Sequence, residues 1–100
     1  MAKTNLRKEA KQRDCQVRIA GVCNHNPETT VLAHYRLKGQ CGVGMKPVDL
    51  CGAWACSACH DVIDGRVKTD IDKLQRDLDH ANGTIRTIIQ LFKEGKIIIV

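Results

Sequence analysis

Six cysteines in a chain of 100 residues constrain this sequence more than any other feature. Two of them belong to the motif Cys56-x-x-Cys59-His60, and Cys15 and Cys23 form a second pair nearer the N-terminus. A Cys-x-x-Cys motif is typical of half a zinc site, of a redox pair or, with a histidine directly after it, of a c-type haem attachment. The rest of the sequence has to decide among these, and it favours zinc.

The composition explains why a metal would help this chain to fold. One hundred residues are enough for one small domain, and with 3% aromatic residues its core has to be aliphatic. Small domains of this kind are commonly stabilised by metal ions or disulfides. No segment resembles a secretory signal or reaches the ~20 apolar residues that span a bilayer. We therefore expect a cytoplasmic protein with no membrane association, whose reduced cysteines bind metal rather than haem or one another.

A structural zinc ion needs four cysteine or histidine ligands. Cys56 and Cys59 supply two from the predicted start of a helix, where backbone N–H groups favour thiolates. Cys15 and Cys23 are the best second pair, although the seven residues between them exceed the usual spacing. Two rival ligands therefore remain: Cys41, in a glycine-rich loop, and Cys51, which we expect to be a small buried apolar side chain.

The hydrophobic pattern predicts a small α+β fold in a single domain over residues 1–100, with a core over 5–66. The core begins with a basic helix and continues with a hairpin and a short helix. In chain order, the predicted elements are a helix over 5–13, strands over 15–19 and 29–34, an irregular loop over 37–49, a helix from 56 to about 64, a long helix over 69–94 and a terminal strand over 96–100.

The long C-terminal helix is predicted from an apolar stripe with alternating steps of three and four residues. Asp70 or the threonine before it can cap its start, and Gly95 suits its end. Gly83 interrupts the composition without shifting the phase, so we expect one helix rather than two. The stripe should pack onto the domain's own core, with a homodimer through this helix as the alternative. Its members are Ile71, Leu74, Leu78, Ala81, Ile85, Ile88 and Phe92.

Two histidines indicate chemistry beyond a structural metal. His34 ends the predicted second strand and His60 lies on the following helix, so the two can face each other. One would serve as a general base near neutral pH. His60 and Asp64, four residues apart on one helical face, would bind Mg²⁺ or Mn²⁺. The alternative is that His34 is a partly buried strand residue and His60 a zinc ligand.

These motifs together resemble the HNH (His-Me finger, ββα-metal) endonucleases, and within them the small YbcO-type nucleases of lambdoid prophages. The resemblance covers residues 5–66 closely and the end of the last helix more loosely. Its segments are Cys15 to Cys23, Asn26 to Thr29, Leu32 to Arg36, Lys46-Pro47, Asp49-Leu50 and Ala55 to Asp64. It implies a phage-derived, metal-dependent DNA endonuclease with a zinc-stabilised ββα-metal core.

The resemblance also implies roles for three positions: general base at His34, the middle position at Asp49 and a cation ligand at His60. The chain departs from the pattern twice. Many HNH enzymes carry aspartate directly before the first histidine, where this chain has Ala33. The middle position is Asp49 instead of asparagine, which can serve as a ligand or orient His34.

The formal net charge of +5 suggests DNA as the partner. Phosphate contacts are expected from the basic N-terminal helix and from the surroundings of His34. The alternative function is a non-catalytic zinc-binding module that binds DNA or acts as an adaptor. His34 favours the enzyme, because a pure zinc module has no use for it. The candidate DNA-binding residues are Arg7, Lys8, Lys11, Arg36, Lys38 and Lys46.

Overall fold

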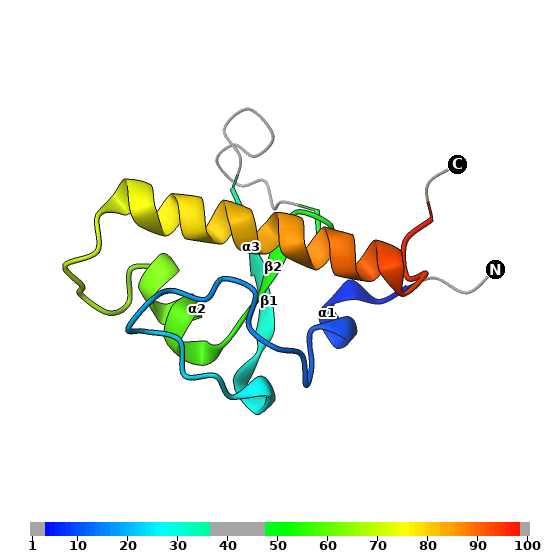
Figure 1. Cartoon of the computed structure of the whole chain (residues 1–100), viewed down its shortest axis with the longest axis horizontal. Helices are drawn as coiled ribbons and strands as arrows, with labels where there is room; N and C mark the ends of the chain where they lie inside the picture. Colours follow the sequence, from blue (N-terminus) through cyan, green and yellow to red (C-terminus); the bar gives the residue numbers. More distant parts are fainter. Residues whose placement is uncertain (1–3, 37–47, 99–100) are drawn as a thin grey trace.

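The computed structural model describes residues 4–36 and 48–98, and it has a small α+β fold in which a β-hairpin is followed by helices. In Figure 1, the long C-terminal helix runs along the length of the molecule and crosses the hairpin. No helix in these two ranges is long and apolar enough to cross a membrane. The elements are α1 (Leu6–Glu9), the 3-10 turn η1 (Pro27–Thr29), β1 (Val31–His34), β2 (Gly52–Ala55), α2 (Ser57–Ile63) and α3 (Lys73–Lys93).

The hairpin pairs β1 with β2 in antiparallel fashion, from Val31 opposite Ala55 to His34 opposite Gly52. The strand predicted over 29–34 is therefore present, but its predicted partner over 15–19 is wrong. That segment is not extended, because Arg18 lies at φ 54 and its backbone N–H donates to the sulfur of Cys15, which closes a turn. It is a loop that makes one backbone hydrogen bond to β2, from the N–H of Gln16 to the carbonyl of Trp54 at 2.7 Å.

A left-handed residue follows each of the two short helices. The helix predicted over 56–64 is confirmed by α2, and Gly65, at φ 75, lies just beyond its end. The side chain of Asn5 caps α1 by accepting from a backbone N–H. This helix ends at Glu9 and is much shorter than the predicted 5–13; a helix through residue 13 is excluded by Gln12, which lies at φ 63.

The long helix α3 runs through Gly83 without a break, as predicted. Its start differs from the prediction: the side chain of Asp72 accepts from the backbone N–H of Leu74 at 2.8 Å, and the helix begins at Lys73. Gly95 ends it at φ 74. Residues 96–98 form no strand, and the last two residues of the predicted terminal strand lie outside the described residues.

The prediction that the apolar stripe packs onto the core is wrong for Leu74, Leu78, Ile85 and Phe92, which are exposed, whereas Ile71, just before α3, does pack against the core. The buried residues of α3 are Gly83, Thr84, Thr87 and Leu91, whereas five large apolar side chains of the helix are exposed. The reason is that the hairpin presents unpaired backbone groups to α3. Thr87 Oγ1 accepts from the N–H of Trp54 at 3.0 Å, and a histidine of α3 donates to a carbonyl of β1. Short polar side chains satisfy these groups and leucines cannot.

The core has two parts, one around buried cysteines and one around Trp54. The second part is closed by an ion-pair network between the two ends of the chain. Arg13 donates to both carboxylate oxygens of Glu94 at 2.6 Å and to Glu9 at 3.0 Å. Its guanidinium also lies 4.6 Å from the centre of the Trp54 ring. This network holds α1 and the end of α3 against the hairpin.

Candidate functional site

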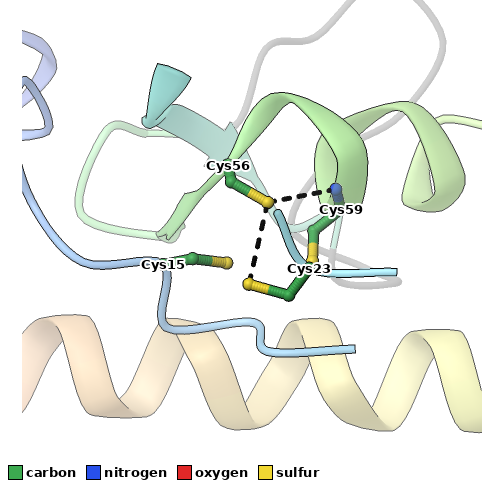
Figure 2. A group of neighbouring side chains, drawn as sticks. All are labelled: Cys15, Cys23, Cys56 and Cys59. Carbon is green, nitrogen blue, oxygen red and sulfur yellow. Dashed lines mark hydrogen bonds between the residues drawn. The ribbon is translucent and has the colours of Figure 1, made fainter. Parts of the chain in front are cut away.

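The sulfur atoms of the four predicted zinc cysteines lie within 4.8 Å of one another. Figure 2 shows them converging from two segments far apart in the sequence. Cys15 and Cys23 come from the loop that precedes β1, and Cys56 and Cys59 come from the start of α2. The fold therefore assembles a four-cysteine cluster consistent with a zinc site.

Two similar backbone turns prepare the cluster. The N–H of Arg18 donates to Cys15 Sγ at 3.4 Å, and the N–H of Cys59 donates to Cys56 Sγ at 3.4 Å. In both turns the donor follows the cysteine by three residues. Donation to sulfur favours the thiolate, which is the form that binds a metal.

A small polar network joins the loop before β1 to the start of α2. Thr29 Oγ1 accepts from the N–H of Ser57 at 3.2 Å, and Asn24 Nδ2 donates to Ser57 Oγ at 3.1 Å. These bonds hold the two cysteine-bearing segments together independently of any metal.

The electrostatics of the cluster favour a bound cation. A hydrogen bond from Cys59 lowers the pKa of Cys15 to about 4, with help from nearby backbone N–H groups. The same bond raises the pKa of Cys59, and burial raises that of Cys23 to about 11, helped by the charge on Cys15. One thiolate thus opposes ionisation of its neighbours, and a divalent cation removes that opposition. Four cysteine ligands are also a standard donor set of structural zinc, so these residues fit the metal.

The rival zinc ligands have different outcomes. Cys51 is a free, half-buried thiol outside the cluster, so it does not replace one of the four cysteines. It is less buried than we expected. Cys41 lies outside the described residues. His60 is not part of the cluster either, which argues against its alternative role as a zinc ligand.

The predicted general base has a carboxylate partner. His34, at the end of β1, lies with its Nε2 2.8 Å from Oδ1 of Asp49. The pKa of Asp49 is lowered, first by this hydrogen bond and then by Arg7, whose Nε is 3.3 Å from the same oxygen. An ionised carboxylate can only accept, so Nε2 carries a proton, and a ring with no second proton presents Nδ1 as an acceptor.

The predicted cation ligands also lie together. His60 Nε2 is 3.2 Å from Oδ2 of Asp64, which follows the last residue of α2. Arg66 Nη2 lies 3.4 Å from the same oxygen. Within residues 4–36 and 48–98, the four cysteines are the one group of three or more potential ligands that is already assembled. In that part of the chain, His60 and Asp64 therefore form a pair without a third assembled ligand.

A cavity of about 220 Å³ brings the predicted base and one predicted cation ligand to a common space. It lies between the end of β1, the end of α2 and the first half of α3. Its lining includes His34, Tyr35, Arg36, Ile63, Asp64, Lys73, Asp77 and His80.

The contribution of α3 to this cavity was missed in the sequence. His80 Nε2 donates to the carbonyl of Ala33 at 2.9 Å, and the ring packs edge-on against Tyr35, with centroids 5.1 Å apart. Burial lowers the pKa of His80 below its usual value. Asp77 forms an ion pair with Lys73, whose Nζ lies 2.8 Å from Oδ2 of Asp77. The available signal was the polar face of α3, which lies opposite its apolar stripe.

Four of the candidate DNA-binding residues are described and exposed. Arg7 and Lys8 lie on α1, Lys11 follows it, and Arg36 follows β1 and lines the cavity. Through Asp49, Arg7 connects α1 to the surroundings of His34. The remaining two candidates, Lys38 and Lys46, lie outside the described residues.

Comparison with known proteins gives a consistent family. The family model described as "Putative nuclease YbcO" matches residues 4–96. Two relatives of that name, from Escherichia coli strain K12 and from Enterobacteria phage 82, are each 54% identical over 93 residues, which are 93% of this chain and 96% of the relative. A solved structure, "Structure of a putative bacteriophage protein from Escherichia coli str. K-12 substr. MG1655", matches with a TM-score of 0.77 and 48% identity over 91% of this chain and all of that chain. This chain therefore belongs to the YbcO family, whose members are described as putative nucleases.

Proposed function

We propose that this protein is a metal-dependent DNA endonuclease of the HNH type, of phage origin, with a structural zinc ion held by its four clustered cysteines. The observation that carries the proposal is the pairing of His34 with Asp49 at 2.8 Å, beside a cavity that Asp64 also lines. The order of hairpin and helix, β1–β2–α2, is that of a ββα-metal core.

His34 is the general base of the proposed reaction. Asp49 holds the ring through Nε2–H and stabilises the imidazolium that forms when Nδ1 takes a proton from water. This assigns the middle position of the motif to orienting the base. A carboxylate there stabilises the protonated ring more strongly than an asparagine would.

His60 and Asp64 are the proposed ligands of the catalytic cation. One imidazole and one carboxylate leave most coordination positions of a cation such as Mg²⁺ or Mn²⁺ free for waters and for a substrate phosphate. When bound, Mg²⁺ or Mn²⁺ would supply the positive charge that stabilises the phosphoryl transition state and the leaving oxygen. Arg66 neutralises Asp64 in the present structure and would have to release it. The aspartate absent from position 33 has a substitute in Asp64, on the same cavity.

DNA would approach across α1 and the end of β1. Arg7 contacts Asp49 and Arg36 lines the cavity with His34; these two residues and Lys8 on α1 are exposed and can contact backbone phosphates. Such contacts carry no sequence information, so cleavage should depend on DNA structure more than on sequence.

The test is cleavage of supercoiled plasmid by the purified zinc-loaded protein with Mg²⁺ or Mn²⁺. His34→Ala should lower the rate by roughly 10²–10⁴-fold, the usual contribution of a positioned base. His60→Ala should weaken activation by the cation without removing zinc. Gln75→Ala is the control: Gln75 is exposed on α3 and does not line the cavity.

The alternative function, a non-catalytic zinc-binding module, makes opposite predictions. The observation in its favour is that Asp64 is already paired with Arg66. It requires that the wild type fails to cut DNA whichever divalent cation is added, yet binds DNA with a log–log salt slope of about −0.9 per phosphate contacted. A robust cleavage activity that survives His34→Ala and His60→Ala would reject the proposed active site.

A further inference from the structure

The outer side of α3 carries apolar side chains that nothing in the described residues covers. Relative exposure is 77% for Leu74, 52% for Leu78, 56% for Ile85, 48% for Ile89 and 51% for Phe92. We call these five residues the outer stripe. Large apolar side chains that are contiguous and exposed to this extent mark an interaction surface. We propose that α3 forms a two-fold antiparallel homodimer by packing its outer stripe against that of a second copy.

The spacing of the apolar residues favours a second copy as the occupant. Leu74, Leu78, Ala81, Ile85, Ile88 and Phe92 are separated by steps of four, three, four, three and four. This series is identical when the helix is reversed, with its centre at Gly83. Two antiparallel copies of α3 can therefore match along this series, in which Leu74, Leu78, Ile85 and Phe92 are exposed and Ala81 and Ile88 are half-buried. The facing pairs would be Leu74 with Phe92, Leu78 with Ile88 and Ala81 with Ile85, the pairing of a two-stranded antiparallel coiled coil.

The apolar area is sufficient for a small specific interface. With about 180 Å² for each fully exposed residue of this size, the outer stripe exposes on the order of 500 Å². Two copies would cover about 1,000 Å² of apolar surface. Together with the polar side chains at its edges, this reaches the lower end of stable interfaces, about 1,200 Å² in total. The inference does not depend on the proposed nuclease activity.

The first experiment is sedimentation equilibrium of the zinc-loaded full chain from about 1 to 200 μM, the range in which small interfaces associate. The wild type should show a reversible monomer–dimer equilibrium. Leu78→Glu should raise the dissociation constant at least tenfold, because it buries a charge. Val67→Glu, at a loop position of 49% exposure before α3, is the matched control and should leave it unchanged. Circular dichroism and zinc content verify the fold of each variant.

The second experiment tests the orientation. Leu74→Lys and Phe92→Glu should each weaken the dimer, because each places a charge against an apolar side chain of the other copy. The double variant should recover association, because in the antiparallel register the two introduced charges are of opposite sign and face each other. A wild type that stays monomeric to 200 μM, or a dimer that Leu78→Glu leaves intact, overturns the proposal. Failure of the double variant to recover overturns the antiparallel register.

Discussion

At the scale of single residues, the cysteine cluster depends on donors that each cysteine's own turn supplies. Arg18 and Cys59 direct their backbone N–H groups at the sulfurs of Cys15 and Cys56, three residues earlier. The loop cysteine Cys51 has a free thiol but lies outside the cluster. The chain thus contains both a proposed ligand and a matched cysteine without that role.

We expect the purified protein to contain about one zinc ion per chain, as a tetrahedral site with four cysteine ligands requires. Cys56→Ser should abolish stoichiometric zinc and soluble folding, because in small metal domains the binding free energy is folding free energy. Cys51→Ser should keep both. Elemental analysis and thermal unfolding measure these outcomes. A Cys56→Ser variant that keeps its zinc would show that the metal is held elsewhere.

At the scale of elements, α3 shows what periodicity can and cannot decide. The pattern correctly predicts one helix through Gly83, because spacing determines which residues share a face. It does not decide which face is buried. Thr87 accepts from the N–H of Trp54 and His80 donates to the carbonyl of Ala33, both in the hairpin. Val17 packs directly on Gly83. The apolar stripe is consequently turned to solvent.

Gly83→Ala should destabilise the protein, although alanine is the better helix former by about 1 kcal/mol. A Cβ at this position would lie 3.0 Å from the backbone N, the Cα and the Cγ2 of Val17, so buried backbone would have to move. We expect a loss of about 1–3 kcal/mol, typical of overpacking. Asn82→Ala, one residue earlier on α3, is the control. Chemical denaturation measures both, and a stabilised Gly83→Ala variant would refute the close packing.

At the scale of the whole molecule, an ion pair joins a residue near the N-terminus to one near the C-terminus. Arg13 binds Glu94, 81 residues away, and stacks on Trp54 in the second part of the core. This contact lowers the pKa of Glu94 to about 2, first through the Arg13 hydrogen bonds and then through Gln90. It closes the fold opposite the cysteine cluster.

The Arg13–Glu94 pair should make stability depend on acid in a defined range. The pKa of Glu94 in the folded protein is about 2, below its usual 4.5, so its contribution is complete above pH 4.5 and is lost as pH falls through 2. The difference in unfolding free energy between wild type and Glu94→Gln should shrink over that range. With Arg13→Gln as background, the dependence should be much smaller, because the hydrogen bond from Gln90 and the charge of Lys96 remain. A difference that stays constant from pH 6 to pH 2 would contradict this account.

The local sequence by itself determined the features that depend on neighbours along the chain. It predicted the Cys56–Cys59 turn, the strand that ends at His34, the short helix carrying His60 and the long C-terminal helix. It also led to Cys15 and Cys23 as zinc ligands, because two cysteine pairs with few alternatives leave few possible sets. Each of these is specified by spacing, capping or ligand chemistry within one segment.

Only the tertiary structure decided how these segments meet. It paired β1 with β2 rather than with residues 15–19, because the cysteine turn at Arg18 uses a left-handed residue that no strand accepts. It brought Asp49 within hydrogen-bond distance of His34 and added Asp77 and His80 to the lining of the cavity. It also turned the polar face of α3 inward. These outcomes depend on which backbone groups remain unpaired after the hairpin forms, and no periodicity within a single segment contains that information.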